Sequence, residues 1–392
     1  MSRHRYVGIM VENGTYMGNI KSQIILVFLL LFSMTAGAVK KQQPLVYYGD
    51  TLEWNKDWQR TQCGTLDIEA NIIEVSGIAC SRVTPGYIWM QSDETERYIV
   101  ATDEEGEERA CKVKMSKTIR WDWEDMSGGI YEGKNYLFIG AFGDNEETDG
   151  NYSIVWFEEP AIDPINAPEI TITPNQIKYV YPDGKKHNAE ALMYDNREQI
   201  LYVITKVYYD VCQVFSLPFR LDYGDETQTL TYECDLGLRS DLGESSNNRP
   251  WKGFHLVTGA DISPDGKYIL IKNHNNIQAP WTWTLLFKRE DGESVAETLR
   301  REKHPGPLAC YVYEWQGEAI CWLDNNTFYT TSDADDGNPP IFKYTRKVPE
   351  DVENIQTDTK GAMEKRIVLI NDAMYICSFD GHLYTVDGRQ VQ

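Results

Sequence analysis

The chain lacks the features that mark zinc proteins, helical proteins and proteins with helical membrane spans. Its eight cysteines form no CxxC pair, so their spacing fits no zinc pattern. No stretch keeps a helical periodicity for long. The apolar run at residues 24–32 is too short to span a bilayer comfortably. These absences favour a β-rich protein without a transmembrane helix.

Positive charge is also scarce. The 392 residues include 38 Lys and Arg against 60 Asp and Glu, and the net charge is −22. Such a surface repels nucleic acid and anionic membranes and favours cations or basic partners, although solubility alone also explains it. We therefore expect a small polar ligand, a glycan or a cation as partner, with a protein partner as a further option and no nucleic acid.

The N-terminal segment has the pattern of a secretory signal peptide. Lys21 precedes the apolar run, and Ala36-Gly37-Ala38 supplies a small-residue cleavage pattern. Residues 1–38 are predicted to be removed, with Met17 as an alternative start. The expected location is the periplasm, the outer surface or the medium, with no transmembrane anchor after cleavage.

Export permits disulfides, although a chain of this length does not need them to fold. Cys80, Cys212 and Cys321 lie in apolar strand patterns. A buried thiol and a bridge explain that placement equally well, so the connectivity stays open.

A degenerate repeat predicts the architecture. Runs rich in Val, Ile, Tyr, Phe and Trp alternate with Asp-Gly, Gly-Asn and Pro-containing turns, which is typical of all-β proteins. Five units open with a small residue beside an acid or hydroxyl, at Ser76-Gly77-Ile78-Ala79, Asp122-Trp123-Glu124-Asp125-Met126, Ala189-Glu190-Ala191-Leu192, Thr258-Gly259-Ala260-Asp261-Ile262 and Gly317-Glu318-Ala319-Ile320. About four strands per unit are characteristic of β-propeller blades.

The predicted fold is a β-propeller of five blades, or six if residues 351–392 contribute. Residues 39–348 form the propeller and 349–392 a linker with a small C-terminal β-module. The fifth unit lacks a fourth strand, and residues 65–75 are expected to supply it and close the ring. The final strands are expected at 366–370, 374–378 and 382–386. They resemble the C-terminal module of many secreted proteins in one group of Gram-negative bacteria, which suggests sorting or anchoring, whereas simple edge packing is the plainer explanation.

Propeller geometry predicts where polar residues gather. The first strand of a blade lines the channel and the second runs back, so first-strand starts and second-strand ends share a face. This rule gathers Glu124, Asp125, Glu190, Asp261, Glu318, Ser92, Asp93, Asp144, Asn145, Lys206, Asn273, His274, Ser332 and Asp333. Converging carboxylates raise one another's pKa or recruit a cation, and oxygen ligands suit Ca²⁺ or Mg²⁺.

The best ligand or metal candidates are Glu124, Asp125, Asp144, Asn145, Glu190, Asp261, Glu318 and Asp333. Glu124, Glu190, Asp261 and Glu318 are the metal candidates, with Lys206 and His274 as supporting bases. A purely structural interpretation competes with this one. Small residues are needed where strands crowd near the axis, and Lys206 can simply neutralise a carboxylate. No nucleophile and base pair is evident.

A family resemblance extends over residues 70–347. It rests on the openings above, Gly143-Asp144-Asn145, Asp195, Thr205-Lys206 and Ser263-Pro264-Asp265-Gly266. The chain resembles a broad group of secreted bacterial propeller proteins, some loosely labelled PE-PGRS-like. It is more remotely similar to gluconolactonase-like and esterase-like phytase propellers, which implies a metal-dependent site at the channel mouth. Gln91-Ser92-Asp93-Glu94 departs from the Asn-Asp-Ser-Gly of the closer group.

Three functions follow as hypotheses. The first is an exported propeller that binds a divalent cation or a small polar ligand at an acidic channel mouth. The second is a metal-dependent hydrolase of lactone, phosphoester or glycan substrates on the same face. The third is a protein-interaction scaffold at the cell surface.

Overall fold

The computed structural model describes two compact units, Met1–Thr345 and Arg346–Gln392. The described residues are 47–48, 58–93, 98–117, 119–120, 122–207, 211–236, 256–274, 282–301, 303–304, 309–311, 314, 316–333, 337–347, 366–370, 373–377, 383–385 and 390–391. The predicted signal peptide, 1–38, lies outside them.

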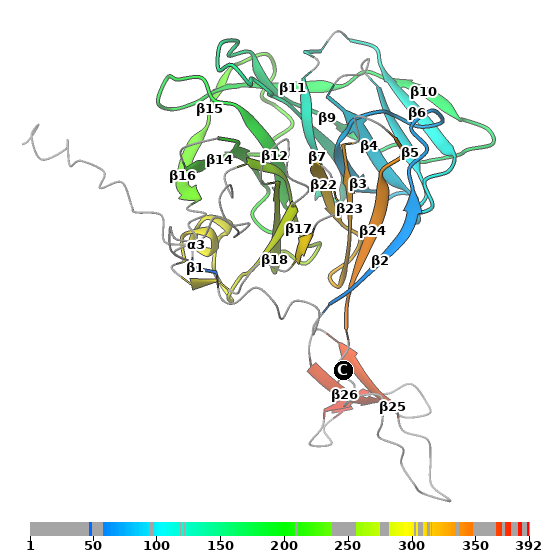
Figure 1. Ribbon diagram of the computed structural model, residues 1–392. Helices are drawn as coiled ribbons and strands as arrows, with labels where there is room; N and C mark the ends of the chain where they lie inside the picture. The colour runs from blue at the N-terminus through cyan, green and yellow to red at the C-terminus, as the bar shows by residue number, and fades with distance from the viewer. Residues whose placement is uncertain are drawn as a thin grey trace, which may run out of the picture. The chain divides into compact units, whose positions relative to one another are not determined.

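The first unit is built from five antiparallel blades (Figure 1). Blade 1 contains β3 (Val75–Cys80), β4 (Ile88–Ser92), β5 (Tyr98–Thr102) and β6 (Arg109–Met115). Blade 2 contains β7 (Trp123–Tyr131), β8 (Lys134–Ala141), β9 (Tyr152–Glu158) and β11 (Asn175–Val180). Blade 3 contains β12 (Ala189–Asp195), β13 (Ile200–Thr205), β14 (Cys212–Pro218) and β16 (Thr231–Leu236).

The remaining blades follow the same order. Blade 4 contains β17 (Leu256–Ile262), β18 (Tyr268–His274), β19 (Thr282–Lys288) and β21 (Ala309–Tyr311). Blade 5 contains β22 (Gly317–Trp322), β23 (Thr327–Ser332), β24 (Pro340–Arg346) and β2 (Trp58–Thr65). The innermost strands contact one another in a closed circle, β3 to β7, β12, β17, β22 and back to β3. The predicted five-bladed propeller is confirmed.

The N-terminal strand closes the ring, but it is not the strand predicted. β2 comprises Trp58–Thr65 and pairs with β24, whereas the prediction placed the closing strand at 65–75. Asp67 explains the difference, because its side chain accepts hydrogen bonds from the backbone N–H groups of Glu69 and Ala70, and its carbonyl accepts one from that of Asn71. Such local bonds favour a turn over a strand. The closing strand therefore ends where the predicted one began.

Some elements of the first unit were not predicted. β10 (Glu169–Ile172) adds in parallel to β6 of blade 1, and β15 (Gln228–Thr229) adds in parallel to β11 of blade 2. β1 (Tyr47–Tyr48) pairs in parallel with β20 (Lys303–His304). Among the described residues there is one helix, α3 (Val295–Arg300), which a capping box of Ser294 and Glu297 begins. No helix in the described ranges is long and apolar enough to cross a membrane.

The second unit contains a four-stranded antiparallel sheet. Its strands are β25 (Arg366–Ile370), β26 (Ala373–Cys377), β27 (Leu383–Thr385) and β28 (Gln390–Val391), paired in chain order. The fourth strand was not predicted. The circle of innermost strands closes with five strands from the first unit, so the alternative of six blades is not realised.

Small residues let the innermost strands approach closely. A Cβ added at Gly77 of β3 would lie 2.5 Å from the Met126 nitrogen of β7. One added at Gly259 of β17 would lie 2.6 Å from the Glu318 carbonyl oxygen of β22. Real Cβ atoms do not approach backbone so closely, so glycine is required at both positions. The small residues of the repeated openings thus have a packing role.

A buried ionic cluster connects the closing strand to blades 4 and 5. Lys272 of β18 lies 2.6 Å from Glu314, and both side chains are essentially inaccessible. Arg60 of β2 lies 3.3 Å from the same carboxylate, which also accepts a hydrogen bond from Thr330 of β23. Burial works to raise the pKa of Glu314, but Lys272 and Arg60 hold it below its ordinary value. The Glu314 carboxylate thus contacts the closing strand β2, blade 4 and blade 5 at once.

We expect Glu314→Gln to destabilise the propeller strongly. Losing one partner of a buried ion pair costs about 3–5 kcal/mol, because the other charge stays buried and unpaired. Glu158→Gln is the matched control, since Glu158 pairs with Lys134 at 2.7 Å on the exposed surface. An exposed pair contributes about 0–1 kcal/mol. Urea unfolding that shows equal losses for the two variants would contradict this account of the closure.

Candidate functional site

The same irregularity recurs in all five innermost strands. The register between the first and second strands shifts at Val75/Gly77, Trp123/Met126, Ala189/Ala191, Val257/Gly259 and Gly317/Ala319. The skipped residues are Ser76, Glu124 with Asp125, Glu190, Thr258 and Glu318. We call Ser76, Glu124, Glu190, Thr258 and Glu318 the bulge ring. Bulges redirect a side chain out of the regular alternation, and they are frequent next to active sites.

Strand pairing places the bulge ring at one end of the channel. Ala189 pairs with Thr205 and Gly317 pairs with Ser332, so each first strand begins opposite the end of its second strand. The predicted gathering of first-strand starts and second-strand ends is therefore present. We call this end the channel mouth.

Hydrogen bonds connect neighbouring members of the bulge ring. The Ser76 hydroxyl donates to the Glu124 carbonyl at 2.5 Å and also lies 3.4 Å from Glu318 Oε2. The Thr258 hydroxyl donates to the carbonyls of Gly317 and Glu318, at 3.0 and 3.3 Å. The hydroxyl members thus donate hydrogen bonds to backbone carbonyls of blades 2 and 5.

Glu190 is held in a firm arrangement at the mouth. Lys206, at the end of the second strand of blade 3, lies 2.6 Å from Glu190 Oε2 with both side chains nearly buried. Asn188 donates to Glu190 Oε1 at 3.1 Å and to Asn145 Oδ1 at 3.1 Å. Lys206 therefore neutralises Glu190, as the purely structural interpretation of the sequence predicted.

Three other carboxyls at the mouth have raised pKa values, because burial and neighbouring acids disfavour their ionised forms. Burial first, and then Glu190 and Asp93, raise the pKa of Glu124 well above its ordinary value. Burial also raises the pKa of Glu318 to about 8, with Lys206 acting against it and Glu190 adding to it. The pKa of Asp93 rises to about 7 through burial and the nearby Asp333 and Glu190.

The surrounding acids stabilise the charged form of Lys206. Burial alone would lower its pKa, but Glu190, Glu318 and Glu124 raise it above its ordinary value. These mutual effects show that Glu124, Glu190, Glu318, Asp93, Asp333 and Lys206 converge at the mouth.

Asp125 and Asp261, both predicted as ligands, crosslink the innermost strands deeper in the channel. Asp125 is fully buried and accepts hydrogen bonds from the backbone N–H groups of Met126, Leu192 and Ala260, on three blades. Asp261 accepts from the Trp322 backbone N–H at 2.8 Å and from the Ser127 hydroxyl at 3.3 Å. Trp322 is four residues beyond Glu318, about 13 Å along a strand. The structure does not bring these two acids into the bulge ring.

The remaining predicted residues have varied surroundings. Asp144 accepts from the N–H groups of Thr148, Asp149 and Gly150 and from the Tyr152 hydroxyl, so its loop occupies both carboxylate oxygens. Burial works to raise its pKa, but these hydrogen bonds hold it below the ordinary value. Asn145 is exposed beside Asn188, and Asp333 accepts from Gln316 at 2.8 Å. His274 ends β18, and its side chain lies outside the described residues.

Several mouth residues were missing from the predicted ligand set. Ser76 and Thr258 occupy the slot that Glu124, Glu190 and Glu318 occupy in their blades, and the repeated openings already contained that signal. Asn188 directly precedes β12, and nothing in the sequence pattern marks it. Asp93 was among the gathered polar residues but not among the chosen ligands.

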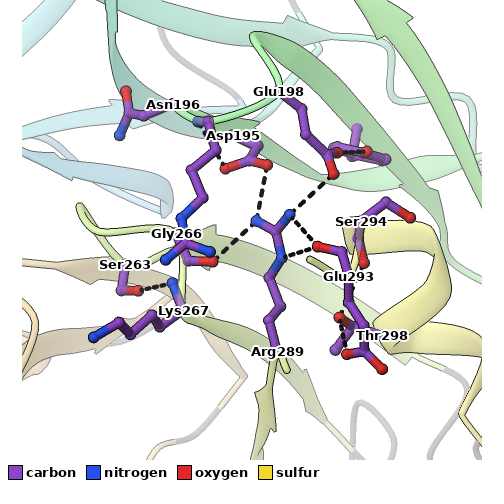
Figure 2. A network of polar contacts seen from close by, with 12 residues as sticks. Asp195, Asn196, Glu198, Ser263, Gly266, Lys267, Arg289, Glu293, Ser294 and Thr298 are labelled. Carbon is purple, nitrogen blue, oxygen red and sulfur yellow. Dashed lines mark hydrogen bonds and ion pairs between the residues drawn. The ribbon is translucent and has the colours of Figure 1, made fainter. Parts of the chain in front are cut away.

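A second polar cluster joins blades 3 and 4 (Figure 2). It lies at the end of their strands that is away from the mouth. Arg289 contacts Asp195 and Glu198, each at 2.9 Å, and its guanidinium also donates to the carbonyls of Gly266 and Glu293. Asp195 is five residues beyond Glu190 on β12, about 17 Å along the strand. The donors of Arg289 are saturated, so this cluster is structural, in contrast to the mouth.

Some buried polar atoms at the mouth lack a hydrogen-bond partner among the described residues. They are Asp93 Oδ1, the Ser332 hydroxyl, and both amide atoms of Gln91. Gln91 and Ser332 lie at the ends of the second strands of blades 1 and 5, and both are buried. Buried polar atoms in folded proteins are normally paired with protein or water.

No preformed metal cage is present within the described ranges. There, no group of three or more His, Cys, Asp or Glu side chains is arranged to hold a metal ion. A bound Ca²⁺ or Mg²⁺ stays a prediction from the sequence.

Comparison with known proteins gives weak likenesses. No family model matches the chain, and no curated protein matches it. Among solved structures, the PQQ-bound aldose sugar dehydrogenase of Streptomyces coelicolor aligns at 8% identity and TM-score 0.37, covering 74% of this chain and 98% of that one. A gluconolactonase of Xanthomonas campestris aligns at 11% identity and TM-score 0.35, covering 70% and 72%.

A Bacteroides thetaiotaomicron protein of unknown function aligns at 10% identity and TM-score 0.37, covering 74% and 76%. Scores this low say nothing about activity. The propeller architecture follows from the strand pairing itself.

The crosslinking role of Asp125 predicts that Asp125→Asn destabilises the protein. The amide keeps one acceptor oxygen, so at least one buried backbone N–H loses its partner, at a cost of about 1–3 kcal/mol. Asp222→Asn is the matched control, because Asp222 is 75% exposed beside Arg220. A surface change of this kind stays within about 0.5 kcal/mol. Chemical denaturation measures both, and an unchanged midpoint for Asp125→Asn would refute the crosslink.

The raised pKa values predict that stability falls with pH. A group whose folded pKa is raised holds a proton that the unfolded chain releases, so its contribution is lost as pH rises through the folded pKa. For Glu318, with a pKa of about 8, and Asp93, with a pKa of about 7, the melting temperature should fall from pH 5 to pH 8.5. Glu318→Gln should flatten this decline. An equal slope in the variant and the parent would show that Glu318 does not carry it.

Proposed function

We propose that this protein is a binding propeller that takes a small, positively charged polar ligand at the bulge ring. The observation that carries the proposal is the convergence of five acids from four blades around Lys206, namely Glu124, Glu190, Glu318, Asp93 and Asp333. A concave site with converging titratable groups is the usual pointer to ligand binding.

The electrostatics of the mouth support a cationic ligand. Lys206 lies 2.6 Å from Glu190, whereas burial and neighbouring acids raise the pKa of Glu124 and of Glu318. Burial and the neighbouring acids make the ionised forms of Glu124 and Glu318 unfavourable. A cation would compensate them directly. Its binding would lower their pKa and displace their protons.

The uncommitted polar atoms support a ligand with hydrogen-bonding groups. Asp93 Oδ1 and the Ser332 hydroxyl are buried at the mouth without a partner among the described residues. An ammonium group donates up to three hydrogen bonds and brings positive charge. An ammonium group therefore supplies both the positive charge and the hydrogen-bond donors that the mouth can bind. The acids come from four blades, and the described ones form no group of three arranged to hold a metal ion, which favours a polyatomic ligand over a single ion.

A divalent cation is the second form of this proposal. Carboxylate oxygens suit Ca²⁺ and Mg²⁺, although the described residues offer no preformed cage for either. Hydrolysis of lactones, phosphoesters or glycans would need that metal and has no separate observation in its favour. As the sequence predicts, we also propose export to the periplasm, the outer surface or the medium. The protein would meet its small polar ligand there.

Isothermal titration of the full chain with putrescine, Ca²⁺ and Mg²⁺ tests the proposal. We expect saturable binding of putrescine that strengthens from pH 6 to pH 9, because the carboxyls lose their protons across that range. At 100 times the Kd, binding adds about 2.7 kcal/mol to the folding stability, which a thermal shift detects.

The variant Glu124→Gln with Glu318→Gln should abolish this binding, and the surface variant Glu158→Gln should leave it intact. Saturation by Ca²⁺ or Mg²⁺ instead of putrescine would establish the metal form of the site. No saturable binding of any of the three probes, or equal binding in the double variant, would refute the proposal.

A further inference from the structure

Two buried thiols meet where the first and last blades join. The Sγ atoms of Cys80 on β3 and Cys321 on β22 are 3.4 Å apart, although the residues are separated by 241 positions in the sequence. Cys80 is 7% exposed and Cys321 1% exposed. β3 and β22 are in contact as neighbouring innermost strands, and the Ser76 hydroxyl lies 3.4 Å from Glu318 nearer the mouth. The two thiols thus lie on the same seam as the bulge ring.

We propose that Cys80 and Cys321 form a disulfide that closes the propeller covalently. In the structure none of the described cysteines, Cys63, Cys80, Cys111, Cys212, Cys234 and Cys321, is bridged. The Cys80 and Cys321 sulfurs are in contact and need to approach by little more than 1 Å to reach the bond length of about 2.05 Å. The bond would connect the innermost strands of blades 1 and 5, the seam at which the chain must close its circle.

The reaction is an exchange with a small-molecule or protein disulfide. One thiolate attacks the oxidant disulfide and releases one thiol, and the second thiolate then displaces the other. The two cysteines lose two electrons and two protons, and the oxidant becomes two thiols. Burial and the neighbouring Cys80 raise the pKa of Cys321 well above its ordinary value, which slows attack in the folded state. The bridge should therefore form during folding, before the seam packs.

The position of the pair explains what the bridge would do. The seam is otherwise held by non-covalent contacts and by β2, which reaches blade 5 from the start of the described propeller. A crosslink between such distant positions constrains the unfolded chain over most of the propeller, and long loops gain most from closure. We expect it to raise the melting temperature and leave the mouth residues unchanged.

Refolding the full chain from denaturant in a buffer of reduced and oxidised glutathione tests the proposal. Alkylation followed by non-reducing peptide mass spectrometry should find one crosslinked peptide pair, which contains Cys80 and Cys321. Reductant should then lower the melting temperature by several degrees. Alkylated Cys80 and Cys321 in refolded, cooperatively melting protein would overturn the proposal.

Two variants separate the bridge from the loss of a buried thiol. Cys80→Ala should remove the crosslinked peptide and the response of the melting temperature to reductant. Cys111→Ala is the control, because Cys111 is fully buried in the same blade and its thiol contacts the Ala167 carbonyl at 3.7 Å. That variant should keep both the peptide and the response. A reductant response that persists in Cys80→Ala would assign the effect to other cysteines and refute the bridge.

Discussion

The close approach of five innermost strands around one axis is the constraint on which the structure depends. Strands this crowded leave room for glycine and alanine, as Gly77 and Gly259 show through the backbone atoms beside them. They also leave backbone N–H groups without partners on the next blade. Side chains bridge the blades: Asp125 accepts from the backbone N–H groups of Leu192 and Ala260, and the Thr258 hydroxyl donates to the Gly317 carbonyl. Polar residues in the channel are therefore required for folding before they are available for binding.

The recurring bulge divides the polar side chains into those that bond to the backbone of other blades and those that lie at the mouth. Within the bulge of β7, Asp125 accepts three backbone N–H groups, whereas the carboxyl of its neighbour Glu124 lies among other acids at the mouth. Glu190 has Lys206 and Asn188 as partners, and the Ser76 hydroxyl lies 3.4 Å from Glu318 Oε2. Burial and neighbouring acids make the ionised forms of Glu124 and Glu318 unfavourable. Arg289 shows the contrast, because all of its N–H donors have acceptors.

The sequence allowed much of this to be predicted, and its limits have physical causes. The repeated openings predicted the blades and the face on which Glu124, Glu190 and Glu318 meet, because strand alternation and blade topology are local rules. The roles of Asp125 and Asp261 were not predictable, since they depend on which residue the bulge skips. In β17 that residue is Thr258, not Asp261. The closing strand was shifted for a similar reason, because the turn at Asp67 depends on side-chain hydrogen bonds.

The central claim is that Glu124, Glu318 and Asp93 at the channel mouth hold protons that a cationic ligand displaces. Titration of putrescine into the full chain at pH 7.5, in buffers of different ionisation enthalpy, counts those protons directly. The account predicts a net release on the order of one proton per ligand, because Glu318 is largely protonated at that pH and Asp93 partly so. Binding with no proton release, or with proton uptake, would contradict it.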